Sequence, residues 1–596
     1  MRQSQARNLV QLFEAQAARQ GDRAAMKFKR DGRWQEISWK EAARRARDVA
    51  DGLASIGVKP GDRVSILADT APEWILADLG IMGAGAITVP IYQSNPPHDV
   101  HYILQDAGSS WLFVDHEHQA AKMRGDVVAL PDLKGIIRFH GSPQTPAERT
   151  LADLERAGVE WRKANPEAHA ARLGAIGLDD PACYLYTSGT TGNPKGVVLS
   201  HGAWTYEAAA AAELKLVNHE DLILMFLPMA HSFAKVIQAV WLAEGATAAF
   251  VESLEKIVDN ASEVRPTVMP SVPRIFEKAY NAVVAKGLAT PGVKGWLFGV
   301  AMNGFEAWAE GKVRGIEVRT IGFRLGEKVV FPKLKAALSE RFGGRMRIFV
   351  SGGAPLSPKV NWFFTLLGFT ILEGWGLTET AAGTCVNRIG ANKIGTVGPA
   401  FPGTEIRIAD DGEILVKGPG VMKEYYRKPE ATAEVLKDGW LYTGDIGELD
   451  ADGYLRITDR KKDLIKTSGG KYVAPQNLEN ELKSDPLISQ VMVHGDQRRF
   501  CSALITLNPE TSRAWATEHG VGDDEALQDH PRMVARIQHS IDALNAKQAG
   551  YATIKRFAIL PEDFTQENGM LTPTLKVKRK VVTTRYKALL DSFYVE

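Results

Sequence analysis

Short runs of β-branched and aromatic residues alternate with helix-patterned segments through most of this 596-residue chain. Residues 64–67, 85–90 and 111–114 have the composition of strands, and residues 39–53 repeat apolar positions at helical spacing. Strands separated by helices usually pair in parallel, with the helices covering the faces of the sheet. We therefore expect an α/β fold built in layers. The length exceeds what a single hydrophobic core serves, so we also expect more than one domain.

The pattern changes near Asp452 and Gly453, where turn-forming residues become frequent. A charged segment, residues 458–463, follows, and a new α/β pattern then continues toward the last residue. We place a domain boundary at this segment. The predicted domains are a large N-terminal α/β domain over residues 1–461 and a small C-terminal α+β domain over residues 462–596.

The charge balance gives no reason to expect a nucleic-acid partner. Lysine and arginine number 72 and aspartate and glutamate number 71, so no net field attracts a polyanion. The three cysteines lie far apart, which argues against disulfides and structural zinc and favours a cytoplasmic protein. The basic start of the chain leaves a mitochondrial presequence as a weaker alternative. No uncharged apolar run approaches the roughly 20 residues that span a bilayer, and nothing predicts an oligomeric state.

One basic segment could contact a membrane peripherally. Residues 312–347 contain ten Lys and Arg against three Asp and Glu, interleaved with apolar residues such as Val313, Ile316 and Phe323. Such a segment could rest on anionic lipid at the inner face of the membrane. Because glycines interrupt a continuous amphipathic helix, we favour a solvated helical face whose apolar side lies in the core. Lipid contact stays as the alternative.

Residues 186–196, with the sequence YTSGTTGNPKG, form the most specific motif in the chain. Glycines and hydroxyl side chains let a backbone fold closely around polyphosphate oxygens, and Lys195 would supply a positive charge. The motif is not a Walker loop, because Pro194 stands where that loop has glycine. Strand-like runs flank it, so we expect a strand–loop–strand unit. The predicted phosphate-binding residues are Thr187, Ser188, Gly189, Thr190, Thr191, Gly192 and Lys195.

Three further motifs have residues suited to the rest of a nucleotide. Residues 374–380 (GWGLTET) contain Glu379, and one carboxylate suits Mg²⁺, which usually keeps only one or two protein carboxylates beside phosphate oxygens and water. Residues 351–357 (SGGAPLS) follow an apolar strand, where ligands approach the backbone in open α/β sheets. Asp445 can accept two hydrogen bonds from a sugar diol, and Arg460 can donate to the same sugar.

Together these motifs resemble those of the adenylate-forming superfamily, which includes acyl-CoA synthetases, luciferases and the adenylation domains of peptide synthetases. The resemblance implies ATP and coenzyme A as substrates and Mg²⁺ as the metal. It also implies that Glu379 binds the metal, Thr378 contacts phosphate, and Asp445 and Arg460 bind the ribose. The implied adenine-binding set is Gly353, Ala354, Pro355, Glu373, Gly374 and Trp375, with the tryptophan stacked on the base.

The resemblance extends to the C-terminal domain and implies that this domain is mobile. Lys462 matches the family hinge, and Gly469 and Gly470 match a strand that leaves room for the pantetheine arm of coenzyme A. Lys576 matches the lysine that serves adenylation. Lys578 stays open as the alternative, because the glycine that usually precedes the adenylation lysine is missing here.

The segment 227–233 (LPMAHSF) resembles the start of the family's acyl-pocket helix, with His231 at its mouth. The apolar positions that would continue this pocket are Val236, Ile237, Val240 and Trp241. A core helix with a capping histidine is an equally open interpretation. Resemblance to long-chain relatives in the extended segment 283–344 favours a long-chain fatty acid.

We therefore predict an AMP-forming long-chain fatty acyl-CoA ligase that forms acyl-AMP and pyrophosphate and then a thioester with coenzyme A. The implied catalytic residues are Lys576, Lys195, Glu379, Thr378 and His231. Two alternatives stay open. One is a fatty acyl-AMP ligase that passes its acyl group to a carrier protein, and the other is a non-catalytic nucleotide-binding homologue.

Overall fold

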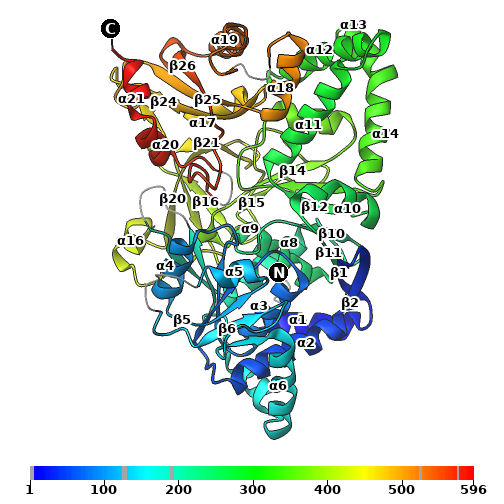
Figure 1. The fold of residues 1–596 in the computed structure, drawn as a ribbon, viewed down its shortest axis with the longest axis vertical. Helices are drawn as coiled ribbons and strands as arrows, with labels where there is room; N and C mark the ends of the chain where they lie inside the picture. Colours follow the sequence, from blue (N-terminus) through cyan, green and yellow to red (C-terminus); the bar gives the residue numbers. More distant parts are fainter. Residues whose placement is uncertain (1–5, 124–129, 188–192, 523–525, 573–575, 596) are drawn as a thin grey trace.

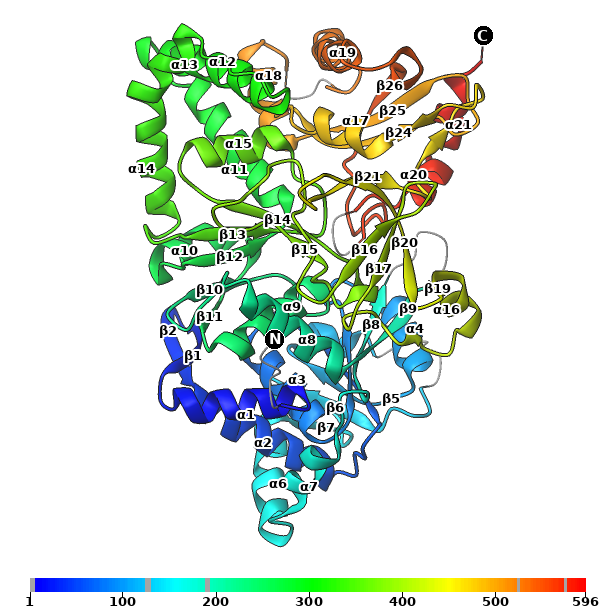
Figure 2. The ribbon, with the colours of Figure 1, turned by 180° about the vertical axis from the view of Figure 1, so that it is seen from behind.

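The computed structural model of the protein describes residues 6–123, 130–187, 193–522, 526–572 and 576–595. The molecule is elongated (Figure 1), with the earliest helices and α6 toward one end and the C-terminal elements, together with α12 and α13, toward the other. The same arrangement is seen from behind (Figure 2).

Two large sheets form the N-terminal part of the described chain. The first has eight strands in the order β18-β9-β8-β4-β3-β5-β6-β7, parallel except where β9 pairs with β8 and with β18. Its strands are β3 (Arg63–Leu67), β4 (Ile87–Ile91), β5 (Ser109–Val114), β6 (Gly135–Arg138), β7 (Glu148–Thr150), β8 (Pro181–Thr187), β9 (Lys195–Ser200) and β18 (Glu424–Tyr425). Every residue of β4 and β5 is buried, as expected for parallel strands covered on both faces.

The second sheet also has eight described strands, in the order β15-β14-β13-β12-β10-β11-β1-β2, with antiparallel pairing only at its two edges. Its strands are β1 (Ala24–Arg30), β2 (Arg33–Ser38), β10 (Leu222–Met225), β11 (Thr247–Phe250), β12 (Val268–Ser271), β13 (Ile348–Ser351), β14 (Ile371–Trp375) and β15 (Cys385–Val386). The predicted layered α/β fold is confirmed.

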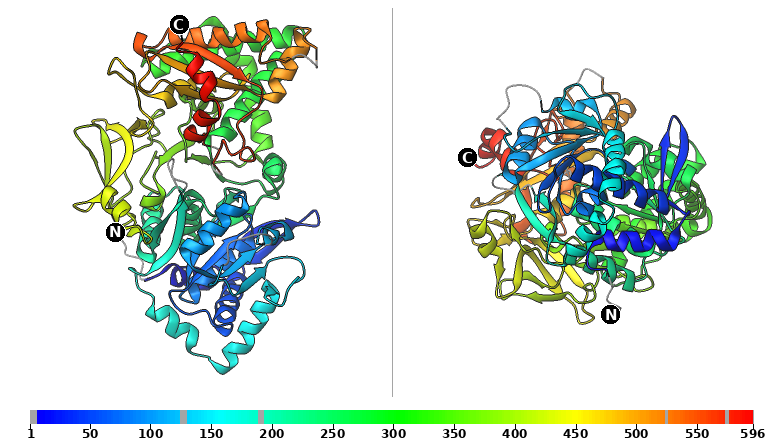
Figure 3. Two further views of the ribbon diagram at one scale, coloured as in Figure 1. Left: turned by 60° about the vertical axis from the view of Figure 1, so that its left-hand side comes forward. Right: turned by 90° about the horizontal axis from the view of Figure 1, so that it is seen from below.

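Smaller sheets follow, antiparallel except where β25 pairs with β26. One sheet contains β16 (Glu405–Ile408), β17 (Glu413–Lys417), β19 (Leu436–Lys437), β20 (Trp440–Leu449) and β21 (Leu455–Arg460). Beyond it lie a ribbon of β22 (Ile465–Lys466) and β23 (Tyr472–Val473) and a three-stranded sheet of β24 (Ile488–His494), β25 (Cys501–Leu507) and β26 (Ile554–Leu560). The antiparallel sheet of β16, β17, β19, β20 and β21 lies to the side of the larger sheets (Figure 3).

Helices cover the sheets and connect their strands. In the first half of the chain they are α1 (Leu9–Gln20), α2 (Trp39–Ser55), α3 (Pro72–Gly83), α4 (Pro97–Ala107), α5 (Glu117–Ala121), α6 (Leu151–Ala164), α7 (Ala168–Ala175), α8 (His201–Glu213), α9 (Ser232–Glu244), α10 (Ile257–Val264) and α11 (Pro273–Leu288). The later helices are α12 (Val293–Val313), α13 (Ile321–Leu325), α14 (Phe331–Arg341), α15 (Pro358–Leu366), α16 (Pro429–Val435), α17 (Pro475–Leu482), α18 (Pro509–Glu518), α19 (Pro531–Asn545), α20 (Arg579–Arg585) and α21 (Lys587–Ser592). The short helical turns are η1 (Leu254–Lys256), η2 (Gly326–Val330), η3 (Thr378–Thr380) and η4 (Gly550–Ala552).

Local sequence explains where several of these helices begin. Ser38 caps α2 by accepting a hydrogen bond from the backbone N–H of Glu41. At the start of α6, Thr150 and Asp153 form a reciprocal capping box. Such caps satisfy backbone N–H groups that have no partner inside the helix.

The hydrophobic clusters of the described chain do not mix residues from before and after the segment 456–464. The large clusters are built from residues up to Leu455, whereas the clusters around β24 and β25 begin at Ile465. Between the two parts, Lys547 pairs with Glu310 at 3.2 Å, and Arg274 donates to Ser489 at 3.3 Å. Among the described residues, none of the helices combines the length and the apolar character needed to cross a bilayer.

Candidate active site

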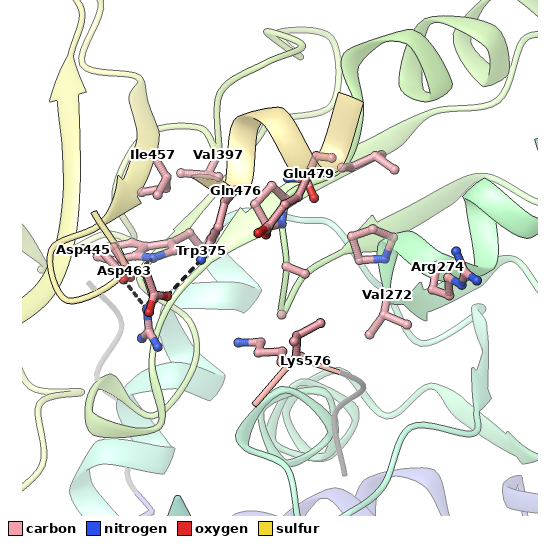
Figure 4. Close-up of a pocket in the computed structure, with 18 of the residues that line it drawn as sticks. Val272, Arg274, Trp375, Val397, Asp445, Ile457, Asp463, Gln476, Glu479 and Lys576 are labelled. Carbon is pink, nitrogen blue, oxygen red and sulfur yellow. Dashed lines mark hydrogen bonds and ion pairs between the residues drawn. The ribbon is translucent and has the colours of Figure 1, made fainter. Parts of the chain in front are cut away.

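A large cavity of about 3180 Å³ lies between the two parts of the molecule. Its walls come from the ends of β13 and β14, the start of α9, the strands β20 and β21, and the segment around Lys576. The cavity thus lies at the carboxyl ends of parallel strands, which is the usual position of ligand sites in open α/β sheets. Residues that are distant in the sequence complete its wall. Figure 4 shows Trp375, Asp445 and Lys576 among the side chains that line this cavity.

Asp445 is the centre of one polar group in the wall. Its two carboxylate oxygens accept hydrogen bonds from Trp375 Nε1 at 2.9 Å and from Arg460 Nε at 2.8 Å. Asp445 on β20 and Arg460 on β21 are direct partners in the antiparallel ladder, which explains why residues 15 positions apart meet. Trp375 thus has a hydrogen-bonding role in addition to offering an aromatic face.

Glu379 lies in a second polar group with Tyr425 and Lys195. The hydroxyl of Tyr425 donates to Glu379 Oε1 at 2.7 Å, and Lys195 Nζ lies 4.8 Å from the centre of the Tyr425 ring. Burial and the nearby Glu379 carboxylate raise the pKa of Tyr425, so its hydroxyl remains a donor at neutral pH. The sequence alone does not indicate Tyr425 as a site residue. The pairing of β18 with β9 at the edge of the first sheet brings it to Glu379.

His231 and Thr378 each contact the first turn of α9. His231 caps this helix, because its Nδ1 accepts the backbone N–H of Phe233 at 3.1 Å. Loss of water around the ring and the charge of Lys576 lower the pKa of His231 to about 4, so the imidazole is neutral at pH 7. Thr378 donates to the hydroxyl of Ser232 at 3.4 Å. His231 therefore caps a helix and also lies on the cavity wall.

Lys576 extends from the C-terminal part into the cavity, and in Figure 4 its ammonium points toward the side where Asp445 and Asp463 lie. Loss of water lowers the pKa of Lys576 to about 8, and Arg460 adds to this shift while Asp445 and Glu379 oppose it. The side chain still has access to solvent through the open cavity. Lys576 is thus a cation with a pKa near neutrality beside the Asp445 and Glu379 groups.

The segment after β13 forms another part of the wall. Gly353, Ala354 and Pro355 line the cavity, and Gly353 has a φ of 81°, a conformation that favours glycine. Glu373 and Gly374 also line it. Glu373 is buried and accepts a hydrogen bond from Asn361 Nδ2 at 3.0 Å, and burial raises its pKa to about 7.

The remaining predicted residues do not all line the cavity, although Thr187 and Lys195 do. Thr187 and Lys195 face each other across the β8–β9 pair, as expected for a strand–loop–strand unit. Ser188, Gly189, Thr190, Thr191 and Gly192 lie outside the described residues. Lys462 is exposed at the cavity rim, whereas Gly469 and Gly470 form an exposed turn between β22 and β23 that does not belong to the cavity wall.

The apolar stripe of α9 is buried in the core. Val236, Ile237, Val240 and Trp241 belong to the main hydrophobic cluster and do not line the cavity, and Trp241 stacks on Trp39 with ring centres 4.6 Å apart. These four positions fit the core-helix interpretation in this structure, and the acyl-pocket interpretation stays a prediction for them. The preceding residues Phe226, Leu227, Ala230 and Phe233 do line the cavity.

Comparison with known proteins agrees with this geometry. The family model for AMP-binding enzymes matches residues 13–426, and the model for the AMP-binding enzyme C-terminal domain matches residues 462–596. The chain therefore belongs to the AMP-binding enzymes, the adenylate-forming superfamily.

Named relatives include long-chain-fatty-acid–CoA ligase FadD15 of Mycobacterium tuberculosis, 39% identical over 95% of this chain and 93% of the relative. Human long-chain-fatty-acid–CoA ligase 1 is 32% identical over 95% of this chain and 83% of the relative. Among solved structures, the anthranilate CoA ligase AuaEII bound to anthranoyl-AMP has the same fold, with a TM-score of 0.74, 21% identity and 98% coverage of both chains.

Proposed function

We propose that this protein is an AMP-forming long-chain fatty acyl-CoA ligase. In the first half-reaction, a fatty acid carboxylate oxygen bonds to the α-phosphorus of ATP, and the bond from that phosphorus to the β-phosphate bridging oxygen breaks, so pyrophosphate leaves. In the second, the sulfur of coenzyme A bonds to the acyl carbon and AMP leaves, while the thiol proton passes to solvent. The single observation that carries this proposal is the convergence of Lys576, Asp445 and Glu379 on one cavity.

Each polar group fits one part of ATP. We assign the ribose to Asp445 and Arg460, the adenine to the wall formed by Gly353, Ala354, Pro355, Glu373, Gly374 and Trp375, and the phosphates to Thr378 and the loop that ends at Lys195. Lys576 would neutralise charge that develops on the phosphates during attack. No side-chain nucleophile is needed, so catalysis depends on positioning and on this charge stabilisation.

The residues present fit a magnesium ion that is shared with substrate. No group of three or more His, Cys, Asp or Glu side chains that could hold a metal ion gathers in the described chain. Glu379 offers one carboxylate, oriented by Tyr425, and Mg²⁺ commonly binds through one or two carboxylates plus substrate phosphates and water. When bound, the ion would neutralise phosphate charge, and Glu379 would hold it.

The two half-reactions need different arrangements. Lys576 stands in the cavity, whereas Gly469 and Gly470, our candidates for the pantetheine path, lie outside it. We propose that the part beginning at Lys462 rotates as a unit, which withdraws Lys576 and brings the glycine turn inward. The structure would then correspond to the adenylation arrangement.

Pyrophosphate release, measured with ATP, magnesium and a panel of fatty acids, tests the reaction, and acyl-CoA formation on adding coenzyme A tests the acceptor. We expect pyrophosphate with long-chain acids and thioester when coenzyme A is present. Pyrophosphate release with none of the acids would refute the enzyme proposal. Acyl-AMP that accumulates although coenzyme A is present would favour transfer to a carrier protein.

A further inference from the structure

Four large apolar side chains are exposed together at one tip of the molecule. Leu288 is 56% exposed, Val293 72%, Trp296 66% and Ile321 88%. They lie at the end of α11, in the first turn of α12 and at the start of α13, which Figures 1 and 2 place at the end of the molecule opposite α6. Contiguous exposed apolar surface of this kind marks an interaction site.

Close packing around α12 makes these four residues neighbours. Val293 and Trp296 are three positions apart and so share one face of the helix. A Cβ added at Gly299 would lie 3.7 Å from Leu288 Cδ2, which places Leu288 against the next turn of α12. Gly322, next to Ile321, packs so closely on Val300 that an added Cβ would lie 2.5 Å from its carbonyl oxygen.

Each of the three helices at this tip has an exposed cation. Lys286, Lys294 and Arg324 are exposed, and their side chains have no hydrogen-bond or ion-pair partner in the part of the chain that the structure describes. Residues 278–305 include three lysines and no aspartate or glutamate. An apolar centre with unpaired cations around it is complementary to a bilayer surface that contains anionic lipid. An indole is a side chain that favours the boundary between headgroups and hydrocarbon.

The tip is connected to the cavity by α12 itself. Ala309, on the same helix, lines the cavity, and Trp308 stacks edge-to-face with Trp362, which also lines it. From Val293 to Ala309 a helix rises about 24 Å. One rigid element therefore joins the exposed apolar surface to the wall of the substrate site.

We propose that this apolar tip, formed by Leu288, Val293, Trp296 and Ile321, docks the protein peripherally on an anionic lipid bilayer, with the three unpaired cations facing the headgroups. The basic segment 312–347 contributes Ile321 and Arg324 to this tip, whereas its Phe323 and Phe331 are buried. The idea that the bilayer also supplies the fatty acid rests on the proposed function. The docking proposal is independent of that function.

Co-sedimentation of the full-length protein with vesicles tests the proposal. We expect a larger fraction of the protein to co-sediment with vesicles of phosphatidylcholine mixed with phosphatidylglycerol than with vesicles of phosphatidylcholine alone. High salt should lower this fraction. Replacing Trp296 and Ile321 by serine should lower the partition coefficient about tenfold or more, because two large side chains no longer enter the interface. Lys286→Gln and Lys294→Gln should each lower binding to anionic vesicles about fivefold.

The matched control is Val159→Ser, an exposed apolar residue on α6 at the opposite end, which should leave binding unchanged. Wild-type protein that stays in solution with both vesicles, or a Trp296→Ser/Ile321→Ser variant that sediments like wild type, overturns the proposal. Thioester formation from detergent-dispersed fatty acid is measured in parallel and should be equal in all variants. Loss of that activity in wild type would count against the proposed function and not against docking.

Discussion

Lys576 and Lys578 are two residues apart but have different surroundings. The side chain of Lys576 experiences Arg460, Asp445 and Glu379 across the cavity, whereas Lys578 precedes α20, and its backbone N–H donates to Met570 at 2.8 Å. We expect Lys576→Ala to slow pyrophosphate release about 100-fold or more, because a preorganised charge near the transition state is removed. Lys578→Ala is the control and should stay within a few-fold of wild type. A large loss at Lys578 alone would contradict the assignment.

The lowered pKa of Lys576 predicts how the first half-reaction depends on pH. Its pKa of about 8 lies below the ordinary lysine value of 10.5, so the ammonium is charged below about pH 8 and neutral above it. The rate of pyrophosphate release should therefore fall as the pH rises through 8. Lys576→Arg keeps its charge at all these pH values and should be slower overall without that fall. If the rate of pyrophosphate release by Lys576→Arg falls over the same pH range as that of wild type, a group other than Lys576 causes the fall.

Residues in continuous motifs could be predicted, and residues that contribute through tertiary contact could not. Asp445, Glu379 and Trp375 stand in strings whose chemistry is readable locally. The Tyr425 hydroxyl donates a hydrogen bond to the Glu379 carboxylate, 46 positions away, so the residues next to Tyr425 do not indicate this role. His231 was open between two interpretations, and both its cap and its place on the cavity wall are present in the fold.

Among the elements, α2 and α6 approach so closely that only glycine fits between them. A Cβ added at Gly158 would lie 2.0 Å from the carbonyl oxygen of Asp48, and one added at Gly52 would lie 2.3 Å from that of Leu154. Gly158→Ala should lower the free energy of unfolding by about 1–3 kcal/mol, because the helices must separate. Thermal or urea unfolding measures this change.

The control for this variant is Gly174→Ala in α7, where an added Cβ meets no atom within 4 Å. Alanine has the higher helix propensity, so this variant should keep or raise stability by up to about 1 kcal/mol. Equal destabilisation by the two variants would show that packing between α2 and α6 is not the cause.

Strands and helices with strong local patterns could be predicted, because burial on both faces of a parallel sheet produces continuous apolar runs such as β5. The environment of a helix face was harder to predict. An apolar stripe such as that of α9 is compatible with a pocket or with the core, and the pattern does not show neighbours such as Trp39, which stacks on Trp241. The pairing of β18 with β9 joins segments more than 200 residues apart, and no local rule predicts it.

At the scale of the whole molecule, an ion pair joins the C-terminal part to α12. Glu310 pairs with Lys547, and both side chains are about half exposed, so the pair stabilises this arrangement by at most about 1 kcal/mol. Glu310→Lys would place two cations together and should slow pyrophosphate release by about two- to fivefold, with less effect on the thioester step. Rapid-quench measurement separates the two steps. Glu317→Lys, in the exposed loop after α12, is the control and should slow neither step.

The cross-strand pair of Asp445 and Arg460 lies immediately before the predicted hinge at Lys462. A rotation that starts at Lys462 would therefore leave both side chains in place on the antiparallel sheet while Lys576 moves away. The ribose of the acyl-adenylate would keep its contacts with Asp445 and Arg460 after pyrophosphate leaves and while the thiol of coenzyme A enters. A reactive mixed anhydride would then be retained between the two steps, with little opportunity to escape and be hydrolysed in solution.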